Sequence, residues 1–397
     1  MSPECTSAPA RSAREVKLTT LHRTVMQALS QVDEWIGEHG APGVGAAVWS
    51  GGEIVAERYA GEGRAGVPVT HETLFPLASV TKPVAAATLM TLVDDGIISL
   101  DEPVGRLLPE FRAGPAPGVE GVEPALERLR PTISARQLLC HVSGLPEDLG
   151  PREARYREEA TIETIIDEMC RLPLQSAPGA ELRYSNVGYG VIARLTEQVS
   201  GQPFWQTAQS RVLAPLGIRD ILADPSGLAL ERVAHLADTS HPETSIETYN
   251  SAYWRGLALP WGGLFGTPRD AVRFAAAFLP SGERFLSEVA TSMMTTDQTL
   301  GVPGGVESAK VRWDPGRWGL GWEVKGEKRR HWTGDFTSER TFCHFGHAGT
   351  LLWGDPERDL ALAVFTNRTV THMWGFILPR WARLSNAVIA AAETTAS

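Results

Sequence analysis

Two patterns of apolar and polar positions follow each other near the N-terminus, the first with helical spacing and the second typical of strands. Apolar side chains at every third or fourth position predict a helix over residues 21–38. Two runs rich in β-forming residues, 43–50 and 53–59, follow it and are joined by Gly51-Gly52, a composition typical of a tight hairpin. The pattern therefore predicts a sheet that begins early in the chain.

Strand-like runs return only towards the C-terminus, before a last helix expected over residues 381–393. The expected late strands are 320–324, 341–345, 350–353 and 359–366. Helical and loop patterns dominate the middle, with helices expected over 89–95, 161–171, 187–199 and 269–279. This order predicts an α/β fold in which both ends of the chain build one sheet and a mainly helical lobe is inserted between them.

The same pattern suggests where the domains lie. Residues 1–18 are expected to be a disordered tail, 19–70 together with 300–397 to form the α/β lobe, and 71–299 the mainly helical lobe. A cleft where two lobes meet is a natural place for a ligand, so we expect the active site between them.

Composition excludes several classes of function. No apolar run approaches the roughly 18 residues of a membrane span, and the net charge of −10 is spread without a basic stripe for nucleic acid. The first residues lack the apolar stretch of a secretory signal, so a cytoplasmic protein is expected. The four cysteines are scattered, which favours reduced thiols over zinc or redox motifs. We expect no cofactor and no metal, and the sequence leaves the oligomeric state open.

Ser79 and Lys82 are the first residues that suggest chemistry. Only five of the 37 basic residues are lysines, and one of them follows a serine by three positions in a run of small and apolar residues. If a helix begins near Ser79, this spacing places both side chains on one face. A lysine made neutral by its surroundings can take the proton of a serine hydroxyl, which arginine cannot do. An ordinary surface lysine is the alternative interpretation.

Tyr184 and Asn186 stand just before the predicted helix 187–199. A phenol beside a lysine ammonium can have a lowered pKa and pass protons to a nearby serine or leaving group, and an asparagine offers a donor and an acceptor to an amide or ester. A packed aromatic ring and a helix N-cap are the alternative explanation for the same residues.

A third candidate is the triplet His347-Ala348-Gly349, which we expect at the start of a strand. Its small residues would let a substrate lie against the strand edge, while the imidazole adds a hydrogen bond or charge. A structural histidine is the alternative. Cys343 and His344 nearby also raise a metal site, but no further ligand stands at a suitable spacing.

The order of these three motifs resembles the active-site signature of the serine β-lactamase and penicillin-binding-protein superfamily. The resemblance is closest to class C β-lactamases and their esterase, D-aminopeptidase and acyltransferase relatives. The segments HVSGLP at 141–146 and GGLFGTPRDAVRFAAAF at 262–278 also look like that family. The family's fold is an α/β lobe, whose antiparallel sheet is flanked by terminal helices, with a mainly helical lobe.

Carried over by position, the resemblance implies a role for each motif residue. Ser79 would be the nucleophile, Lys82 its base and Tyr184 the proton relay. Asn186, Gly349 and Thr350 would contact the substrate, and the backbone N–H groups of Ser79 and Thr350 would form an oxyanion hole. His347 would be the fourth catalytic residue and would stand where penicillin-hydrolysing members carry a lysine.

Two departures from the β-lactamase pattern shape the expected function. The third triplet has no permanent cation for the carboxylate of a β-lactam, and no export signal is recognisable. Both favour a cytoplasmic esterase or acyltransferase acting on an ester, thioester or amide, with a small-molecule acyl donor and an alcohol or amine as a possible acceptor. A true β-lactamase or D-amino-acid peptidase and a non-catalytic penicillin-binding-like sensor are the alternatives. Four tryptophans would line an apolar acyl pocket or else pack in the core: Trp254, Trp261, Trp318 and Trp332.

Overall fold

The computed structural model describes residues 13–150 and 156–394. Seven strands form the main sheet in the order β10-β11-β12-β13-β1-β2-β3, and every neighbouring pair is antiparallel. The strands are β1 (Gly43–Ser50), β2 (Glu53–Arg64), β3 (Val67–Pro68), β10 (Glu323–Val324), β11 (Phe342–Gly346), β12 (Thr350–Asp355) and β13 (Leu360–Thr366). The prediction of one antiparallel sheet built from both ends of the chain is confirmed.

β1 and β13 join the two ends, because Val44 pairs with Thr366 and the register continues to Ser50 and Leu360. Side chains alternate along both strands, so Val48 packs on one face of the sheet and Ala47 on the other. The turn between β1 and β2 is Gly51-Gly52, and both glycines have positive φ, 58° and 101°. Such a turn matches the twist of the strands it connects.

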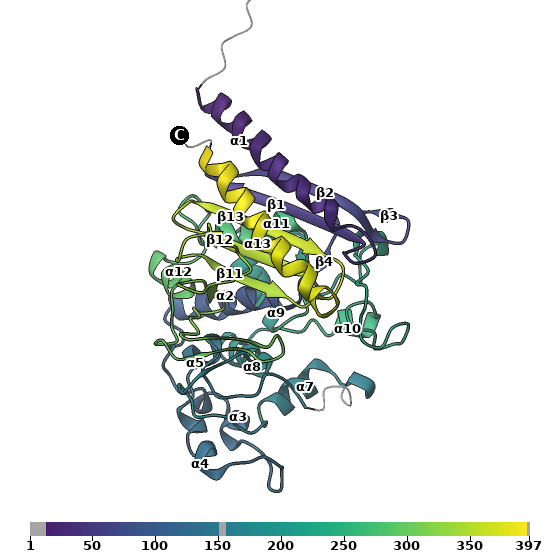
Figure 1. The fold of residues 1–397 in the computed structure, drawn as a ribbon. Helices are drawn as coiled ribbons and strands as arrows, with labels where there is room; N and C mark the ends of the chain where they lie inside the picture. The colour runs from purple at the N-terminus through teal and green to yellow at the C-terminus, as the bar shows by residue number, and fades with distance from the viewer. Residues whose placement is uncertain (1–12, 151–155, 395–397) are drawn as a thin grey trace, which may run out of the picture.

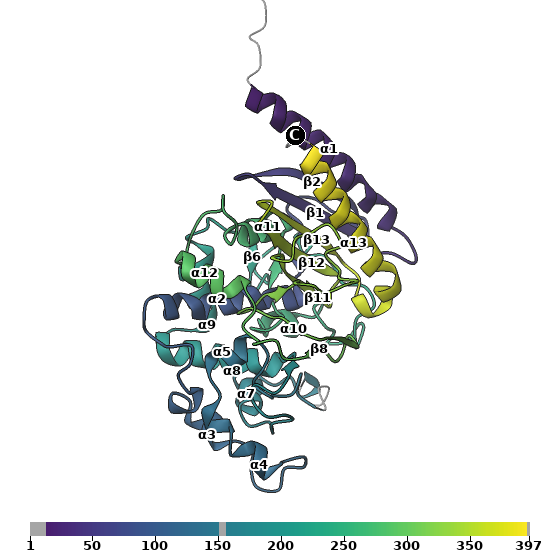
Figure 2. The ribbon, with the colours of Figure 1, turned by 60° about the vertical axis from the view of Figure 1, so that its left-hand side comes forward.

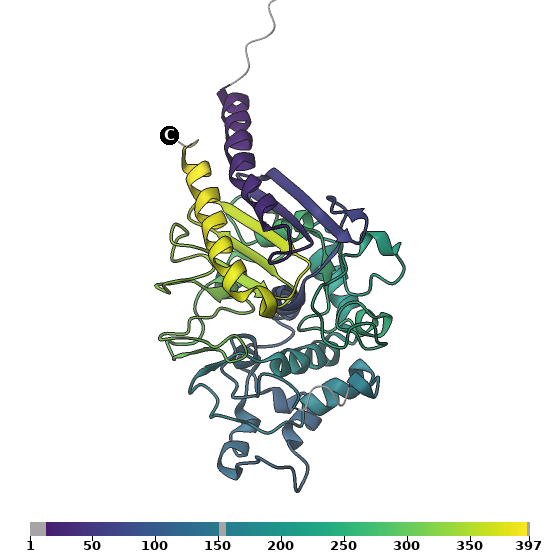
Figure 3. The same cartoon turned by 45° about the vertical axis from the view of Figure 1, so that its right-hand side comes forward.

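The two terminal helices lie side by side on one face of the sheet, as Figures 1 and 3 show. They are α1 (Ala13–Leu29), which continues as a 3-10 turn over Ser30–Trp35, and α13 (Val370–Thr394). α13 is longer than the predicted 381–393, whereas α1 begins and ends earlier in the chain than the predicted 21–38. Residues 13–18, expected in a disordered tail, belong to α1, whereas residues 1–12 lie outside the described residues. α13 contains Pro379, which interrupts the sequence pattern but not the helix.

Helix α11 (Pro268–Ala276) covers the opposite face of the sheet, against β1 and β13, and the mainly helical part of the chain lies beyond it (Figure 2). Further α-helices in the described ranges are α2 (Thr81–Asp94), α3 (Pro109–Ala113), α4 (Pro124–Glu127), α5 (Ala135–Leu139), α7 (Ile162–Met169), α8 (Asn186–Ser200), α9 (Phe204–Ala208), α10 (Ala252–Gly256) and α12 (Glu288–Thr295). α11 lies within residues 71–299, which were assigned to the helical lobe, and yet it packs on the sheet. The boundaries of the two lobes therefore stay a prediction.

Two small sheets of three strands each accompany the main sheet. One contains β4 (Phe75–Pro76), β7 (Phe265–Gly266) and β6 (Ile221–Leu222), and the other β5 (Leu182–Arg183), β8 (Gly304–Val306) and β9 (Val311–Trp313). The predicted strand 320–324 is shorter than expected, because Gly321 with φ of 97° breaks the extended run before β10. Among the described residues, no helix combines the length and apolarity needed to cross a membrane.

Candidate active site

Ser79 lies in a single 3-10 turn, Ala78–Val80, that leads directly into α2. The residue before it, Ala78, has φ of 48°, a left-handed conformation that non-glycine residues adopt at an energetic cost and that is common at functional sites. Ser79 is half-buried, whereas Lys82, one turn later, is completely buried. The Lys82 Nζ lies 3.1 Å from the Ser79 Oγ, so the two side chains meet as their spacing predicts.

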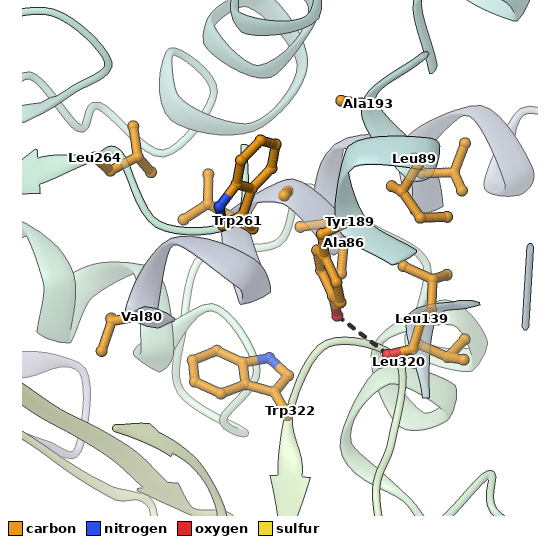
Figure 4. Close-up of a cluster of buried hydrophobic side chains, with 14 of the residues drawn as sticks. Val80, Ala86, Leu89, Leu139, Tyr189, Ala193, Trp261, Leu264, Leu320 and Trp322 are labelled. Carbon is orange, nitrogen blue, oxygen red and sulfur yellow. Dashed lines mark hydrogen bonds between the residues drawn. The ribbon is translucent and has the colours of Figure 1, made fainter. Parts of the chain in front are cut away.

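A loop from the segment 259–266 holds this turn in place. The carbonyl of Trp261 accepts a second hydrogen bond from the Lys82 Nζ at 2.7 Å. The N–H of Leu264 donates to the Thr81 Oγ1 at 3.1 Å, and its carbonyl accepts from the N–H of Leu77 at 2.8 Å. Figure 4 shows Trp261 and Leu264 in the buried apolar cluster that surrounds α2. The nucleophile candidate therefore stands on a rigid, well-packed support.

Tyr184 lies between β5 and α8, and the Lys82 Nζ is 4.7 Å from the centre of its ring. Burial raises the pKa of Tyr184 well above its ordinary value, and the Ser79 hydroxyl acts more weakly in the opposite direction. The expectation of a lowered phenol pKa is wrong, because loss of water outweighs the nearby groups. No described residue lies at both the distance and the angle of a hydrogen bond to the Tyr184 hydroxyl.

Asn186 is the first residue of α8, and the N-cap is its neighbour Ser185, whose Oγ accepts the N–H of Gly188 at 2.9 Å. The amide nitrogen of Asn186 donates to Asp148 at 2.7 Å. Its Oδ1 is buried and makes no hydrogen bond within the part of the chain that the structure describes. Asn186 thus offers a carbonyl oxygen, and one of its two N–H donors is already engaged.

His347 is exposed and lies in the tight turn between β11 and β12, not at the start of a strand as expected. Gly349 in this turn has φ of 83°, and a Cβ there would stand 2.1 Å from the Thr366 Oγ1, so only glycine fits. Thr350 opens β12, and its Oγ1 donates to the carbonyl of Leu77 at 2.9 Å. This bond holds the start of β12 against the turn that carries Ser79.

Three residues around Tyr184 were not identified as site residues from the sequence. The ring centres of His141, Trp318 and His344 lie 4.5, 5.7 and 6.0 Å from that of Tyr184. Burial, helped by Lys82, lowers the pKa of His344 to about 3, so both its nitrogens serve as neutral polar groups. His141 belongs to the family-like segment HVSGLP, which could have marked it as a site residue, but the sequence of that segment suggests no role for the histidine.

Of the two roles open to the four tryptophans, packing in the core is favoured over lining an acyl pocket. Trp261, Trp318 and Trp332 are at most 5% exposed and pack within the hydrophobic core, and only Trp254 is half-buried. Two cavities of about 570 and 540 Å³, whose walls include Arg269 and Arg317 respectively, have none of the candidate catalytic side chains in their lining.

One group of possible metal ligands is present among the described residues. The ligand atoms of Glu323, His331 and Cys343 lie within 4.8 Å of one another, and all three are buried. The ammonium of Lys328, however, donates to the Glu323 carboxylate at 2.6 Å, and His331 lies 3.2 Å from the same oxygen. A buried lysine already supplies the positive charge in this cluster, so it fits an ion-pair network better than a metal site.

The sequence is similar to that of a known protein family over most of its length. The family model described as β-lactamase matches residues 23–385. Esterase EstB of Burkholderia gladioli is 29% identical over 399 residues, covering 90% of this chain and 93% of the esterase. A putative D-alanyl-D-alanine carboxypeptidase of Escherichia coli O157:H7 is 25% identical and covers 86% and 83%.

Solved structures confirm the fold. EstCE1, described as a hydrolase with promiscuous acyltransferase activity, superimposes with a TM-score of 0.71 at 23% identity, covering 95% of this chain and all of that one. The match of the family model extends over the sheet, α2, Tyr184 and the β11–β12 turn alike. The chain therefore belongs to the β-lactamase family, and it is a serine hydrolase of the β-lactamase type.

Proposed function

We propose that the protein is an esterase or acyltransferase that forms a covalent acyl intermediate on Ser79. The contact of 3.1 Å between the Ser79 Oγ and the Lys82 Nζ carries the proposal. A half-buried hydroxyl that a substrate can reach is paired with a fully buried amine that water reaches poorly. This pairing suits a nucleophile and its general base.

In the acylation step, the neutral amine of Lys82 takes the proton of Ser79 as the Oγ bonds to the acyl carbon. The negative charge that develops on the carbonyl oxygen is stabilised by the backbone N–H groups of Ser79 and Thr350, whose closeness the Thr350–Leu77 hydrogen bond supports. The bond to the leaving oxygen then breaks. Tyr184, which burial keeps protonated, donates its proton to that oxygen and regains one from the Lys82 ammonium.

In the second step, water or an acceptor hydroxyl or amine attacks the acyl carbon and gives up its proton to the same pair of groups. The bond between the acyl carbon and the Ser79 Oγ then breaks, and the Oγ takes that proton back, which restores the free serine. Water then yields the free acid, and an acceptor yields an ester or amide. EstCE1 is described as a hydrolase with promiscuous acyltransferase activity, which makes transfer a reaction to test for this chain. Hydrolysis is the simpler outcome, because a transferase must also bind its acceptor beside the ester and exclude water from it.

β-Lactams and D-alanyl peptides are the second class of substrate to consider, since one relative is described as a putative carboxypeptidase. The exposed His347 stands at the position where β-lactam-hydrolysing relatives carry lysine. An imidazole at neutral pH is a weaker partner for a substrate carboxylate than a permanent ammonium. We therefore propose esters as better substrates than β-lactams. A non-catalytic sensor is disfavoured, because Ser79, Lys82 and Tyr184 are all present and close together.

A substrate panel tests this proposal. Short-chain p-nitrophenyl esters, nitrocefin and a D-alanyl-D-alanine peptide are assayed with the wild type and Ser79→Ala. Esters are expected to give the highest kcat/KM, and Ser79→Ala is expected to abolish turnover of all three. A kcat/KM for nitrocefin equal to that of the best ester would refute the ester assignment.

Partition of one acyl donor separates transfer from hydrolysis. With the donor held constant, rising concentrations of alcohols and amines should divert product from acid to ester or amide. Saturation of this diversion at millimolar acceptor would indicate an acceptor site and a transferase. A strictly linear diversion would indicate an esterase. The cytoplasmic location stays a prediction that neither assay addresses.

A further inference from the structure

His141 occupies an unusual position directly behind Tyr184. It follows α5 and is completely buried, and its φ of 61° is left-handed. Its ring lies against Tyr184 at a centre-to-centre distance of 4.5 Å and a tilt of 35°, and against Tyr189 at 5.3 Å. A non-glycine residue kept in this conformation at a buried site indicates that its neighbours require that geometry.

His141 accepts hydrogen bonds from the residues immediately before and after Tyr184. The carbonyl of His141 accepts the N–H of Arg183 at 2.8 Å, and its Nδ1 accepts the N–H of Ser185 at 3.0 Å. The N–H of Tyr184 itself donates to the carbonyl of Gly305 in β8 at 3.2 Å. The backbone that carries Tyr184 is thus fixed on one edge by β8 and on the other by a single residue, His141.

The bond from Ser185 also defines the protonation state of the ring. Because Nδ1 accepts a backbone N–H, the single proton of the neutral imidazole lies on Nε2. Burial lowers the pKa of His141 well below its ordinary value, and Lys82 and His344 add to this shift. Protonation of Nδ1 would abolish the bond to Ser185, so burial and hydrogen bonding favour the same neutral state.

We propose that His141 is a positioning residue that holds the Tyr184 hydroxyl in register with Ser79 and Lys82 through its bond to the N–H of Ser185. The proposal rests on the proposed function, in which Tyr184 transfers protons at Ser79. His141 touches no reacting atom in this scheme and acts on the rate through Tyr184 alone. A displacement of Tyr184 by about 1 Å would cost on the order of 10²-fold in rate.

Two substitutions of His141 by an amide residue distinguish this positioning role from a general packing role. In His141→Asn the amide oxygen lies at the distance of Nδ1 from the backbone, and asparagine tolerates left-handed φ, so the bond to Ser185 can persist. In His141→Gln the amide lies one carbon farther out and cannot replace Nδ1. Cys140→Ala is the matched control, because Cys140 is the preceding buried residue and its thiol points to the carbonyl of Gln298 at 3.8 Å.

The measurement is kcat and KM for a chromogenic ester, together with the melting temperature of each variant. His141→Gln is expected to lower kcat by about 10- to 100-fold with KM within about threefold, since Tyr184 acts in the transition state. His141→Asn is expected to recover at least about tenfold of that loss, and Cys140→Ala to keep the wild-type kcat. In a Tyr184→Phe background, His141→Gln should cost no further activity.

Equal kcat values for the Asn and Gln variants would overturn the proposal, as would full additivity of His141→Gln with Tyr184→Phe. A loss of kcat in Cys140→Ala as large as that in His141→Gln would also overturn it, because destabilisation of the loop would then explain both. Labelling of Ser79 by a fluorophosphonate distinguishes this failure from failure of the proposed function. If wild type labels at Ser79, only the role of His141 is in question, whereas absence of labelling refutes the acyl-enzyme itself.

Discussion

Among the described residues Lys82, Lys325 and Lys328 are buried, and Lys82 and Lys328 differ in the charge of the groups that accept their hydrogen bonds. Lys82 donates to the Ser79 hydroxyl and to the carbonyl of Trp261, both neutral acceptors. Lys328 donates to the Glu323 carboxylate at 2.6 Å and to the carbonyl of Arg317 at 3.0 Å. Both side chains have lost most contact with water, so the acceptors decide what each lysine can do.

A carboxylate partner favours the ammonium form of a lysine, whereas neutral acceptors in a buried site do so much less. Around Lys328 the effect is visible on its partner: burial raises the pKa of Glu323, but the charges of Lys328 and His331 outweigh it and the net pKa is lowered. The comparison suggests that Lys328 is a structural cation and that Lys82 is available as a base. The first three of the following predictions each test one side of this contrast.

The largest effect is expected from Ser79→Ala, which removes the group that Lys82 would serve. The variant should fold normally and lose about 10⁴- to 10⁶-fold in kcat, the scale seen when a serine nucleophile is removed. Ester turnover and the melting temperature are measured together. Retention of a tenth of the wild-type turnover would contradict the assignment of the nucleophile.

Lys82→Arg should be nearly as harmful as Lys82→Ala, with a loss of about 10²- to 10⁴-fold in kcat/KM. Arginine keeps the positive charge but cannot act as a base near neutral pH. Lys310→Arg is the matched control, since Lys310 is exposed and should keep wild-type activity. If Lys82→Arg retained most of its kcat/KM, Lys82 would be an electrostatic group and the contrast with Lys328 would fail.

Lys328→Met should behave in the opposite way, lowering stability and leaving kcat of the folded enzyme unchanged. Removing one partner leaves the buried Glu323 charge uncompensated, which costs about 3–5 kcal/mol of unfolding free energy. Urea denaturation measures the loss. The double variant Glu323→Gln with Lys328→Met should recover part of it, and a double variant as unstable as Lys328→Met alone would argue against the ion pair as the cause.

A smaller effect is expected from the pH dependence of stability. Burial lowers the pKa of His344 to about 3, so below pH 6.5 the unfolded chain binds a proton there that the folded chain does not. Stability contributed by this group is complete above pH 6.5 and is lost as the pH falls towards 3. His344→Gln should therefore flatten the decline of unfolding free energy between pH 6 and 4 by at most about 1.4 kcal/mol per pH unit. An identical decline in both proteins would show that His344 is solvated.

The sequence predicts most of the site because its first motif is local. A spacing of three positions between Ser79 and Lys82 on a helical turn brings the side chains together whatever the rest of the fold does. The antiparallel sheet and the terminal helices also followed from periodicity and from resemblance to the family. What was missed depends on pairing between distant segments, which periodicity does not specify.

The Glu323 cluster and His141 illustrate this limit. Glu323 meets Cys343 only because β10 pairs with β11 in that register, and His141 meets Ser185 across a loop. The pKa of Tyr184 was predicted in the wrong direction, because its distance from Lys82 could be anticipated but its complete burial could not. His347 was placed in a strand because its turn is three residues long and lies between two strands.

Direct detection of the acyl-enzyme tests the central claim, that Ser79 activated by Lys82 is the nucleophile. The protein is mixed with an activated ester or a fluorophosphonate, quenched in acid, and analysed by intact mass and peptide mapping. The wild type should gain the mass of one acyl or phosphonyl group on the peptide that contains Ser79. Ser79→Ala should gain none and Lys82→Arg should be modified far more slowly. Modification of Ser79→Ala at the wild-type rate, or mapping of the group to another residue, would contradict the account.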